Sequence, residues 1–243
     1  MNATQYLDLR ELMRLNIGGI QKLTLLDFPG KVACTLFTVG CNLRCPFCHN
    51  ASLVTHPQDA GYVTDDELYS FLKKRVGILD GVCVTGGEPT LQKDLPEFLS
   101  TLKELGYAVK LDTNGTSPKL LRSVISDGLI DYVAVDIKNS PEKYVMTSGG
   151  IDRLDDIKET VSLLLSGDID YEFRTTVVSG FHEVSDFESI GKWISGAKRY
   201  FIQSFVDSGD LIDSSVIGIP GSEMNEMLSV ARKYVPQTEL RGI

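Results

Sequence analysis

The chain has 243 residues and a formal net charge of −9, with 33 acidic against 24 basic side chains. An acidic chain argues against a partner held through nucleic-acid phosphates. No uncharged apolar run approaches the ~18 residues of a membrane span, and residues 1–16 lack a basic start followed by an apolar core. We therefore expect a cytoplasmic protein with no membrane or nucleic-acid partner, and its 42% hydrophobic residues can fill a sizeable core.

Short apolar segments alternate with helical segments along the chain. Strands are predicted at 32–39, 81–86, 107–112, 131–138, 171–178 and 199–206. Helices are predicted at 65–75, 95–106, 118–128, 151–167, 183–196 and 222–235. The first of these helices has Thr64 as N-cap and Glu67 three residues on, the pattern of a capping box.

This alternation predicts an α/β fold with a parallel sheet and right-handed crossovers. The strands lack a clean period of two, as expected when both faces of a sheet are buried. Because no glycine-rich dinucleotide fingerprint is present, we favour a partial (β/α)6 barrel over a nucleotide-binding doubly wound sheet. One domain is expected over 17–243, after an N-terminal extension, 1–16, in which a short helix would fit.

Cys41, Cys45 and Cys48 form a C-x3-C-x2-C motif. Three thiolates of one loop can hold three corners of an iron–sulfur cube, which normally takes four. One iron would then keep the open position that a catalyst needs and a structural site avoids. Zinc is the alternative, with His49 as a fourth ligand. Cys34 and Cys83 lie alone in apolar runs and are expected to be buried, with no ligand role.

The strand at 81–86 runs into Gly86, Gly87 and Glu88, written TGGEPTLQ. Two glycines let the backbone approach a ligand closely, and a carboxylate with bare carbonyls supplies acceptors for an ammonium group. An ordinary strand-to-helix turn, which also favours glycine, is the alternative.

Oxygen-bearing side chains end the next two strands. Asp112 and Thr113 close one, and Asp136 closes the other. Barrel chemistry gathers at the carboxyl ends of strands, where these oxygens could share a hard cation. Lys138 could reach a carboxylate there. The alternative is a simple Asn-Gly turn at Asn114 and a surface pair of Asp136 with Lys138.

The loop GCNLRCPFCHN, with Phe47 before the third cysteine, resembles the radical S-adenosylmethionine (radical SAM) superfamily. In that family the open iron of a [4Fe–4S] cluster chelates the amino and carboxylate groups of SAM, and a GGE motif holds the amino group. The segments CHN, GGEPTLQ, LDTNG and AVDIK together look like the activating enzymes of glycyl radical enzymes, those of anaerobic ribonucleoside-triphosphate reductase and pyruvate formate-lyase above all. The similarity covers about residues 17–206.

This resemblance implies the roles of several residues. Asp112, Thr113 and Asp136 would bind a monovalent cation near the SAM carboxylate. Lys138 would face the methionine end of SAM with Arg174 nearby, and Phe47 would contact the adenine. The implied reaction is reductive cleavage of SAM to a 5′-deoxyadenosyl radical, which takes a hydrogen atom from a glycine of a partner glycyl radical enzyme. A flavodoxin or ferredoxin would supply the electron, in an anaerobic setting.

The sequence departs from the pyruvate formate-lyase activators in one motif. Their last barrel strand ends in PYH, whereas the corresponding stretch here reads QSFVDSGD and has no histidine. Residues 49–82 contain no cysteine, so no additional clusters are expected. His56 and His182 lie in polar loops and are expected to be exposed to solvent. Trp193, at helical spacing, is expected in the core.

Two other functions compete with the activase. A small-molecule radical SAM enzyme such as 7-carboxy-7-deazaguanine synthase shares a short barrel and a GGEP motif. An iron–sulfur electron carrier or a zinc-binding module needs neither GGEP nor ordered polar residues at strand ends. The CHN and DTNG/DIK motifs favour the activase. The open side of a six-stranded barrel suits an extended glycine loop, since a small-molecule site more often buries its ligand. An anaerobic ribonucleotide reductase is the expected partner.

Overall fold

The computed structural model describes residues 15–59 and 61–242. It confirms the predicted fold class: an α/β fold whose eight-stranded, mostly parallel sheet has the strand order β1 to β8. The chain divides into two compact units. The first unit comprises Met1–Asn42, Ser52–Thr113 and Lys119–Val133, and the second comprises Leu43–Ala51, Asn114–Pro118 and Ala134–Ile243.

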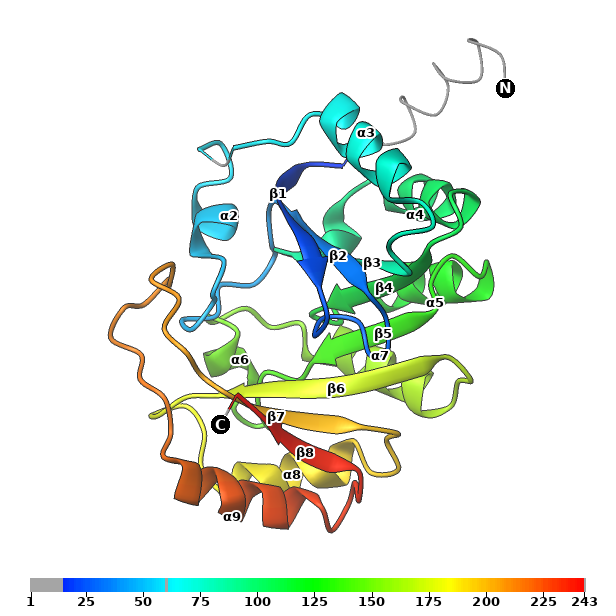
Figure 1. Ribbon diagram of the computed structural model, residues 1–243. Helices are drawn as coiled ribbons and strands as arrows, with labels where there is room; N and C mark the ends of the chain where they lie inside the picture. The colour runs from blue at the N-terminus through cyan, green and yellow to red at the C-terminus, as the bar shows by residue number, and fades with distance from the viewer. Residues whose placement is uncertain (1–14, 60, 243) are drawn as a thin grey trace. The chain divides into compact units, whose positions relative to one another are not determined.

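The first unit contains four strands, drawn in blue to green in Figure 1: β1 (Ile17–Thr24), β2 (Ala33–Thr38), β3 (Gly81–Gly86) and β4 (Ala108–Thr113). β1 pairs with β2 antiparallel, whereas β2, β3 and β4 run parallel. Thr38 and Gly86 are register partners at the carboxyl ends of β2 and β3. The cysteine loop and the Gly-Gly-Glu turn therefore leave the sheet side by side.

The helices of this unit begin and end close to the predicted residues: α3 (Asp65–Arg75), α4 (Leu95–Glu104) and α5 (Pro118–Ser126). Thr64 and Glu67 form the predicted capping box at the start of α3. Phe98 and Leu102 of α4 are fully buried, as are Cys34 and Cys83 of the strands. These cysteines pack as small hydrophobic side chains, as predicted.

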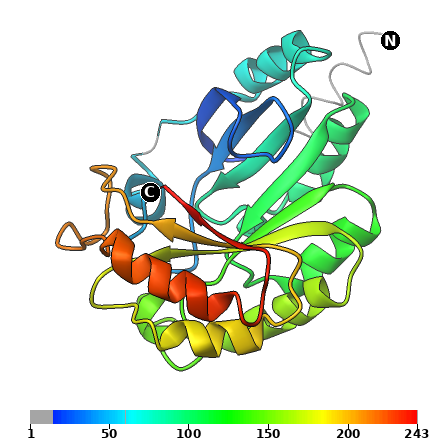
Figure 2. The same cartoon turned by 60° about the horizontal axis from the view of Figure 1, so that its bottom comes forward.

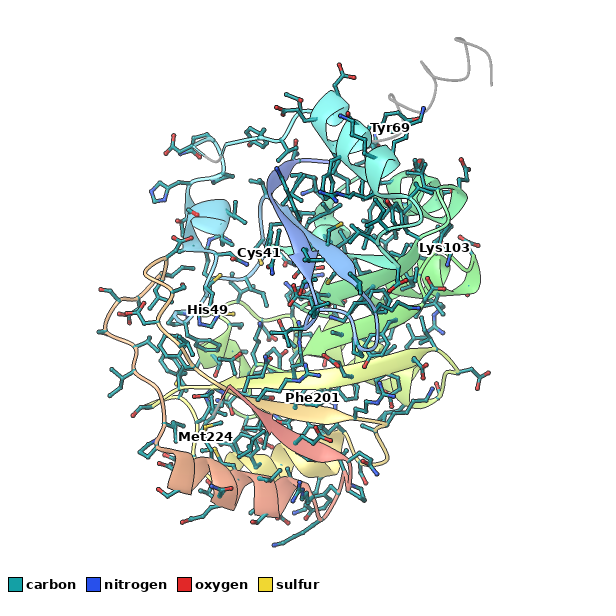
Figure 3. The ribbon with its side chains drawn as sticks, in the orientation of Figure 1. Cys41, His49, Tyr69, Lys103, Phe201 and Met224 are labelled. Atoms are coloured by element: carbon teal, nitrogen blue, oxygen red, sulfur yellow. The ribbon has the colours of Figure 1, made fainter. Side chains whose placement is uncertain are left out.

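The second unit is built around parallel strands: β6 (Asp170–Val177), β7 (Tyr200–Ser204) and β8 (Thr238–Arg241). The strand β5 (Tyr132–Asp136) ends in it. Its helices are α6 (Tyr144–Thr147), α7 (Leu154–Leu165), α8 (Asp186–Trp193) and α9 (Gly221–Ala231). Figure 2 shows α8 and α9 lying side by side along β7 and β8. Met224 of α9 is fully buried and points toward these strands in Figure 3.

All six predicted strands are present, as β2 to β7. The edge strand β1 and the four-residue β8 were not predicted, and neither were the short helices α2 (Ala51–Thr55), α6 and the 3-10 turn η1 (Pro89–Leu91). The helix considered within 1–16 lies almost wholly outside the described residues. Within the described residues, no helix combines the length and apolar character needed to cross a membrane.

Candidate active site

The cysteine loop begins directly after β2. Cys41 belongs to the first unit, and Cys45 and Cys48 belong to the second. The Cys48 amide donates to the Cys45 carbonyl at 3.0 Å, which closes a tight turn between these two thiols. All five cysteines lie among the described residues, and none is in a disulfide.

A glycine turn after α6 supports this loop in the second unit. The Arg44 amide donates to the Ser148 carbonyl at 3.1 Å. Gly149 follows with φ +79°, and a Cβ there would lie 2.2 Å from the Arg44 carbonyl oxygen. Only glycine fits so close an approach at positive φ. The sequence Ser-Gly-Gly reads as a generic turn, so its role in holding the cysteine loop was not predicted.

Two glycines pack against the start of the cysteine loop from within the first unit. A Cβ on Gly86 (φ +116°) would lie 2.2 Å from the Thr38 amide nitrogen, and one on Gly87 would lie 2.0 Å from the Gly40 carbonyl oxygen. The Gly87 and Glu88 amides donate to the Thr38 and Gly40 carbonyls, each at 2.8 Å. These glycines are therefore required for close backbone packing within the first unit, and the predicted close approach of a ligand stays a prediction.

Glu88 is completely buried, and its carboxylate gathers neutral donors on Oε1. The Thr90 amide and hydroxyl donate at 3.1 and 2.6 Å, and the Thr113 hydroxyl donates at 2.7 Å. Thr113, predicted as a cation ligand, thus ties the end of β4 to the Gly-Gly-Glu turn. These donors fix the orientation of the carboxylate, and a carboxylate is an acceptor suited to an ammonium group.

Lys110 and Asp112 form an ion pair inside the first unit. Both lie on β4 two residues apart and therefore on one face of the strand. Lys110 is 1% exposed, and its Nζ also lies 3.9 Å from Cys83 Sγ and 5.9 Å from the centre of the Tyr132 ring. Lys110 was not predicted as part of the site. The polar–apolar–polar pattern Lys-Leu-Asp within a buried strand was the signal that could have found it.

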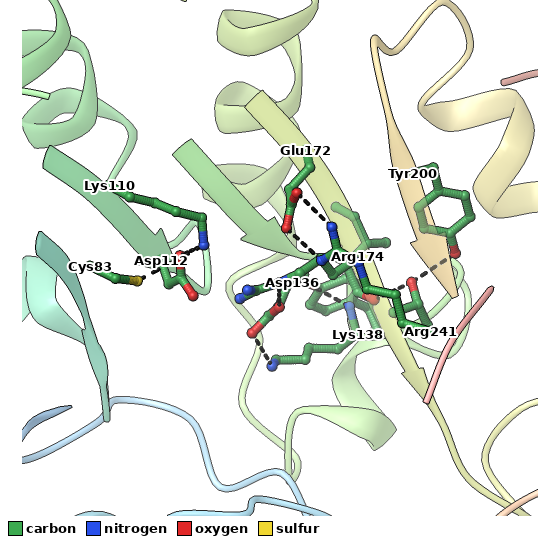
Figure 4. Close-up of polar contacts among 12 residues, drawn as sticks. Cys83, Lys110, Asp112, Asp136, Lys138, Glu172, Arg174, Tyr200 and Arg241 are labelled. Carbon is green, nitrogen blue, oxygen red and sulfur yellow. Dashed lines mark hydrogen bonds and ion pairs between the residues drawn. The ribbon is translucent and has the colours of Figure 1, made fainter. Parts of the chain in front are cut away.

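A second ion pair, with the same spacing, ends β5 in the other unit (Figure 4). Asp136 Oδ2 contacts Lys138 Nζ at 3.0 Å, and Asp136 Oδ1 contacts Arg174 Nε at 2.9 Å. Burial alone would raise the pKa of Asp136, but Arg174 and then Lys138 outweigh it and hold that pKa well below its usual range. Lys138 keeps its charge in return: Asp136, followed by Cys45, outweighs the effect of burial and raises the pKa of Lys138.

The cation site stays a prediction. Two carboxylates close together repel unless a cation lies between them, which would be a further reason for a metal ion at Asp112 and Asp136. The structure gives each carboxylate a cationic partner in its own unit, Lys110 for one and Lys138 with Arg174 for the other. Repulsion therefore no longer supports a metal ion there. No group of three or more His, Cys, Asp and Glu side chains within the described ranges is already gathered as for a metal ion.

The expectation for His182 is wrong. Its side chain is 3% exposed and is hydrogen-bonded to the backbone at both ring nitrogens. His56 is exposed, as predicted, and Trp193 is only partly buried. His182 is buried although its segment is polar, because the loop 178–186 folds back over the end of β5. Phe47 is also buried, and its ring meets the edge of His182 with centroids 6.0 Å apart.

The unpredicted strand β8 carries a further buried ion pair. Arg241 Nη1 and Nη2 bind the two carboxylate oxygens of Glu172 at 2.9 and 3.1 Å, and the guanidinium carbon lies 3.2 Å from the centre of the Phe201 ring. Glu172 is 1% exposed. This bidentate pair joins β8 to β6 and satisfies a carboxylate that would be costly to bury alone.

Comparison with known protein families shows to which family the chain belongs. The family model described as the Radical SAM superfamily matches residues 35–194. The chain belongs to this superfamily. A protein of Methanocaldococcus jannaschii, provisionally named a glycyl-radical enzyme activating enzyme, is 32% identical over 239 residues, covering 95% of this chain and 98% of the relative.

Two partial likenesses agree with this family. The pyruvate formate-lyase-activating enzyme of Staphylococcus aureus is 34% identical over 108 residues, 42% of this chain and 43% of that protein. The crystal structure of Streptococcus suis SuiB matches the fold with a TM-score of 0.64 at 13% identity, covering 84% of this chain and 47% of SuiB. The chain is thus a radical SAM enzyme, and its family implies a [4Fe–4S] cluster and SAM.

The residues present fit these groups. Three thiols come from one glycine-supported loop, and none is locked in a disulfide. Burial raises the pKa of Cys48, and the backbone hydrogen bond from Asn50 and then the charge of Lys138 act against this rise without reversing it. The Nε2 atom of His49, next to Cys48, is buried without a hydrogen-bond partner, and its ring stacks on Phe205 with centroids 5.2 Å apart. The loop therefore offers polar atoms that a bound group could satisfy.

Proposed function

We propose that this radical SAM enzyme activates a glycyl radical enzyme, an anaerobic ribonucleotide reductase, by taking a hydrogen atom from a glycine of that partner. The observation that carries the proposal is the likeness to the M. jannaschii protein, which runs through 95% of this chain and 98% of its relative. The motifs CHN, DTNG and DIK, on which the resemblance to activases rests, lie within the aligned length. The coarser chemistry, that of radical SAM enzymes, already follows from the family.

Cys41, Cys45 and Cys48 would hold the cluster. When bound, a [4Fe–4S] cluster supplies the electron that breaks a carbon–sulfur bond of SAM and so yields methionine and the 5′-deoxyadenosyl radical. The protein contributes orientation and exclusion of water rather than an acid or base. Buried Cys45 and Phe47 provide an apolar surrounding for this chemistry in the second unit.

Two sets of residues would bind the two ends of the methionine moiety. Gly86, Gly87 and Glu88 would hold its amino group, because bare carbonyls and a carboxylate are acceptors. Lys138 would meet its carboxylate, with Arg174 holding Asp136 so that Lys138 is not fully neutralised by it. Phe47 would contact the adenine through its ring.

A monovalent cation bound by Asp112, Thr113 and Asp136 is part of the proposal and has a test of its own. Activity should then depend on Na+ or K+, and the Asp136→Asn variant should lose that dependence along with much of its rate. Full activity of the unchanged protein in a buffer free of monovalent metal ions would contradict the proposed cation site. The electron donor would be a flavodoxin or ferredoxin. Because an open iron site is oxygen-sensitive, we expect the protein to work in the reducing cytoplasm of an anaerobe.

The test of function is electron paramagnetic resonance on the reduced, cluster-loaded protein mixed with SAM and a candidate partner. We expect a glycyl doublet that disappears when the partner's glycine is replaced by alanine. Any of the changes Cys41→Ala, Cys45→Ala and Cys48→Ala should abolish both SAM cleavage and the doublet. Cys34→Ala is the matched control, since Cys34 is buried away from the loop and should leave both intact.

Two results would contradict the proposal. Cleavage of SAM stimulated by a deazapurine, with no doublet on any partner, would favour a synthase of the 7-carboxy-7-deazaguanine type. Stoichiometric zinc after anaerobic loading, in place of about four irons per chain, would show that the cysteines do not hold an iron–sulfur cluster.

A further inference from the structure

Side chains hold the backbone on both sides of Lys138. β5 ends at Asp136, and the Ile137 amide still donates to the carbonyl of Arg174 in β6 at 2.8 Å. The Lys138 amide donates to the Tyr144 hydroxyl oxygen at 3.2 Å, and that hydroxyl donates to the Asp136 carbonyl at 3.2 Å. The Thr175 hydroxyl donates to the Ile137 carbonyl at 2.7 Å. Such hydrogen bonds restrict the backbone that carries the Lys138 ammonium group.

His182 completes this set by bonding to the Lys138 carbonyl, with Nε2 at 2.8 Å from the oxygen. A carbonyl only accepts, so Nε2 carries the hydrogen. Nδ1 lies 3.2 Å from the Val178 amide nitrogen and 3.4 Å from the Val178 carbonyl oxygen. A neutral ring with its hydrogen on Nε2 accepts from the Val178 amide through Nδ1. Its orientation is set by two backbone groups 4 and 44 residues away in sequence.

The same imidazole contacts Phe47. The two rings meet edge to face, with centroids 6.0 Å apart and planes at 68°. Phe181, the residue before His182, also meets Phe47 edge to face at 6.1 Å. Asn139 Nδ2 donates to the Phe181 carbonyl at 2.8 Å and so joins this turn to the residue after Lys138. His182 thus lies between the ring of Phe47 and the backbone of Lys138.

We propose that His182 is a positioning residue that fixes Phe47 and Lys138 as one binding surface for SAM. The inference rests on the proposed function, in which Phe47 contacts the adenine and Lys138 the methionine carboxylate. A ligand that uses both groups gains affinity when they are held together before it binds, because less freedom is lost on binding. His182 itself need not touch SAM.

Two variants separate the two contacts of His182. His182→Gln keeps an N–H that can reach the Lys138 carbonyl but loses the aromatic edge against Phe47. His182→Phe keeps the edge and loses the hydrogen bond. We expect His182→Gln to weaken binding of 5′-deoxyadenosine and to spare methionine, and His182→Phe to do the reverse. His182→Ala should weaken SAM about tenfold, the scale of one hydrogen bond with an aromatic contact.

The measurement is calorimetric titration of the cluster-loaded protein with SAM, 5′-deoxyadenosine and methionine. His56→Ala is the matched control, because His56 is exposed and should leave all three affinities unchanged. Folding is checked separately, before loading, by the emission of Trp193. This is the single tryptophan of the chain, and its ring lies 5.9 Å from that of Tyr144, which holds the Lys138 amide.

The outcomes distinguish this inference from the proposed function. Wild-type protein that fails to bind SAM would overturn both. Normal wild-type binding with unchanged affinities in His182→Ala would overturn the positioning role alone. Parallel losses for both fragments in His182→Gln and His182→Phe, or altered Trp193 emission in every variant, would assign His182 to the stability of the fold and overturn the inference as well.

Discussion

Two lysine–aspartate pairs with the same two-residue spacing, one in each unit, differ in burial. Lys110 with Asp112 lies within β4, where the lysine side chain is 1% and the aspartate 10% exposed. Lys138 with Asp136 lies at the end of β5, where the values are 19% and 31%. Lys110 is sealed against its partner and is expected to serve the fold, whereas the partly exposed Lys138 can still meet a ligand. The same pairing would then support structure in one unit and the proposed recognition of SAM in the other.

The two carboxylates proposed for the site differ in a related way. Oε1 of Glu88 gathers the amide and hydroxyls of Thr90 and Thr113, which are neutral donors. Asp136 has a cation on each oxygen. Neutral donors orient the Glu88 carboxylate, while a carboxylate placed between two cations serves to orient those cations. This contrast fits the proposal that Glu88 binds an amino group and Lys138 a carboxylate.

The largest effect that tests this comparison is on stability. Lys110→Met should lower the free energy of unfolding by about 3–5 kcal/mol, because it leaves the Asp112 charge buried without its partner. The double variant Lys110→Met with Asp112→Leu should recover most of this loss, since neither charge remains. Urea unfolding of the full chain measures both. If Lys110→Met changed stability by no more than a surface substitution, the pair would not be structural.

An intermediate effect is expected on binding. Lys138→Met should weaken SAM by about 1.5–3 kcal/mol, the scale of a hydrogen bond to a charged group. Unfolding should change by less than in Lys110→Met, because the Lys138 pair is partly exposed and Asp136 keeps Arg174 as a partner. Lys198→Met is the control: Lys198 is 42% exposed and lies 3.6 Å from Asp170. Calorimetric titration gives the affinities, and an affinity equal to that of the control would contradict the contrast between the two lysines.

The same binding assay tests the other carboxylate. Glu88→Gln keeps an oxygen for the donors of Thr90 and Thr113 but removes the charge, so SAM should again weaken by about 1.5–3 kcal/mol. An analogue of SAM without the amino group should bind the variant and the unchanged protein alike. Unchanged affinity for SAM itself would show that the amino group is held elsewhere.

Much of the fold follows from local patterns. β3 and α3 match their predicted residues because glycines and a capping box mark their ends. β1, with the sequence IGGIQKLT, and β8, with TELR, carry no such pattern. Each is a strand because a neighbour supplies hydrogen bonds, and for β8 also because Arg241 binds Glu172. Tertiary context of this kind outweighs strand propensity.

The residues of the candidate site likewise differ in how far they could be predicted from the sequence. Cysteine spacing and the Gly-Gly-Glu turn are local motifs and could be read from the sequence. The surroundings of His182 could not, because its bond to Lys138 spans 44 residues and its loop is polar. Lys110 lies between these cases. Its same-face pairing with Asp112 follows from the period of two in a strand, but its burial depends on Tyr132, which lies 22 residues further along the chain.

The smallest expected effect concerns the pH dependence of stability. It should arise in the second unit, where His182 lies. Neither carboxylates nor lysines in their usual ranges titrate between pH 5.5 and 7.5, but histidine does. Burial is the main effect on His182 and lowers its pKa, against the opposing influence of the Lys138 and Val178 carbonyls and of Asp186. As pH falls below about 6.5, the unfolded chain therefore takes up a proton before the folded one. The free energy of unfolding should therefore decrease as the pH decreases, by at most about 1.4 kcal/mol per pH unit for this group.

His182→Asn isolates that contribution, because burial also lowers the pKa of His49 and adds a slope of the same sign. Urea unfolding at pH 5.5 to 7.5 should show a shallower dependence in His182→Asn than in the unchanged protein. Lys138→Met keeps the carbonyl that accepts from His182 and should retain the full slope. Protonation of Nδ1 removes the acceptor for the Val178 amide and leaves the Nε2 hydrogen bond to the Lys138 carbonyl in place, so the effect is one on stability. Equal slopes with and without His182 would mean that this histidine does not distinguish the two units.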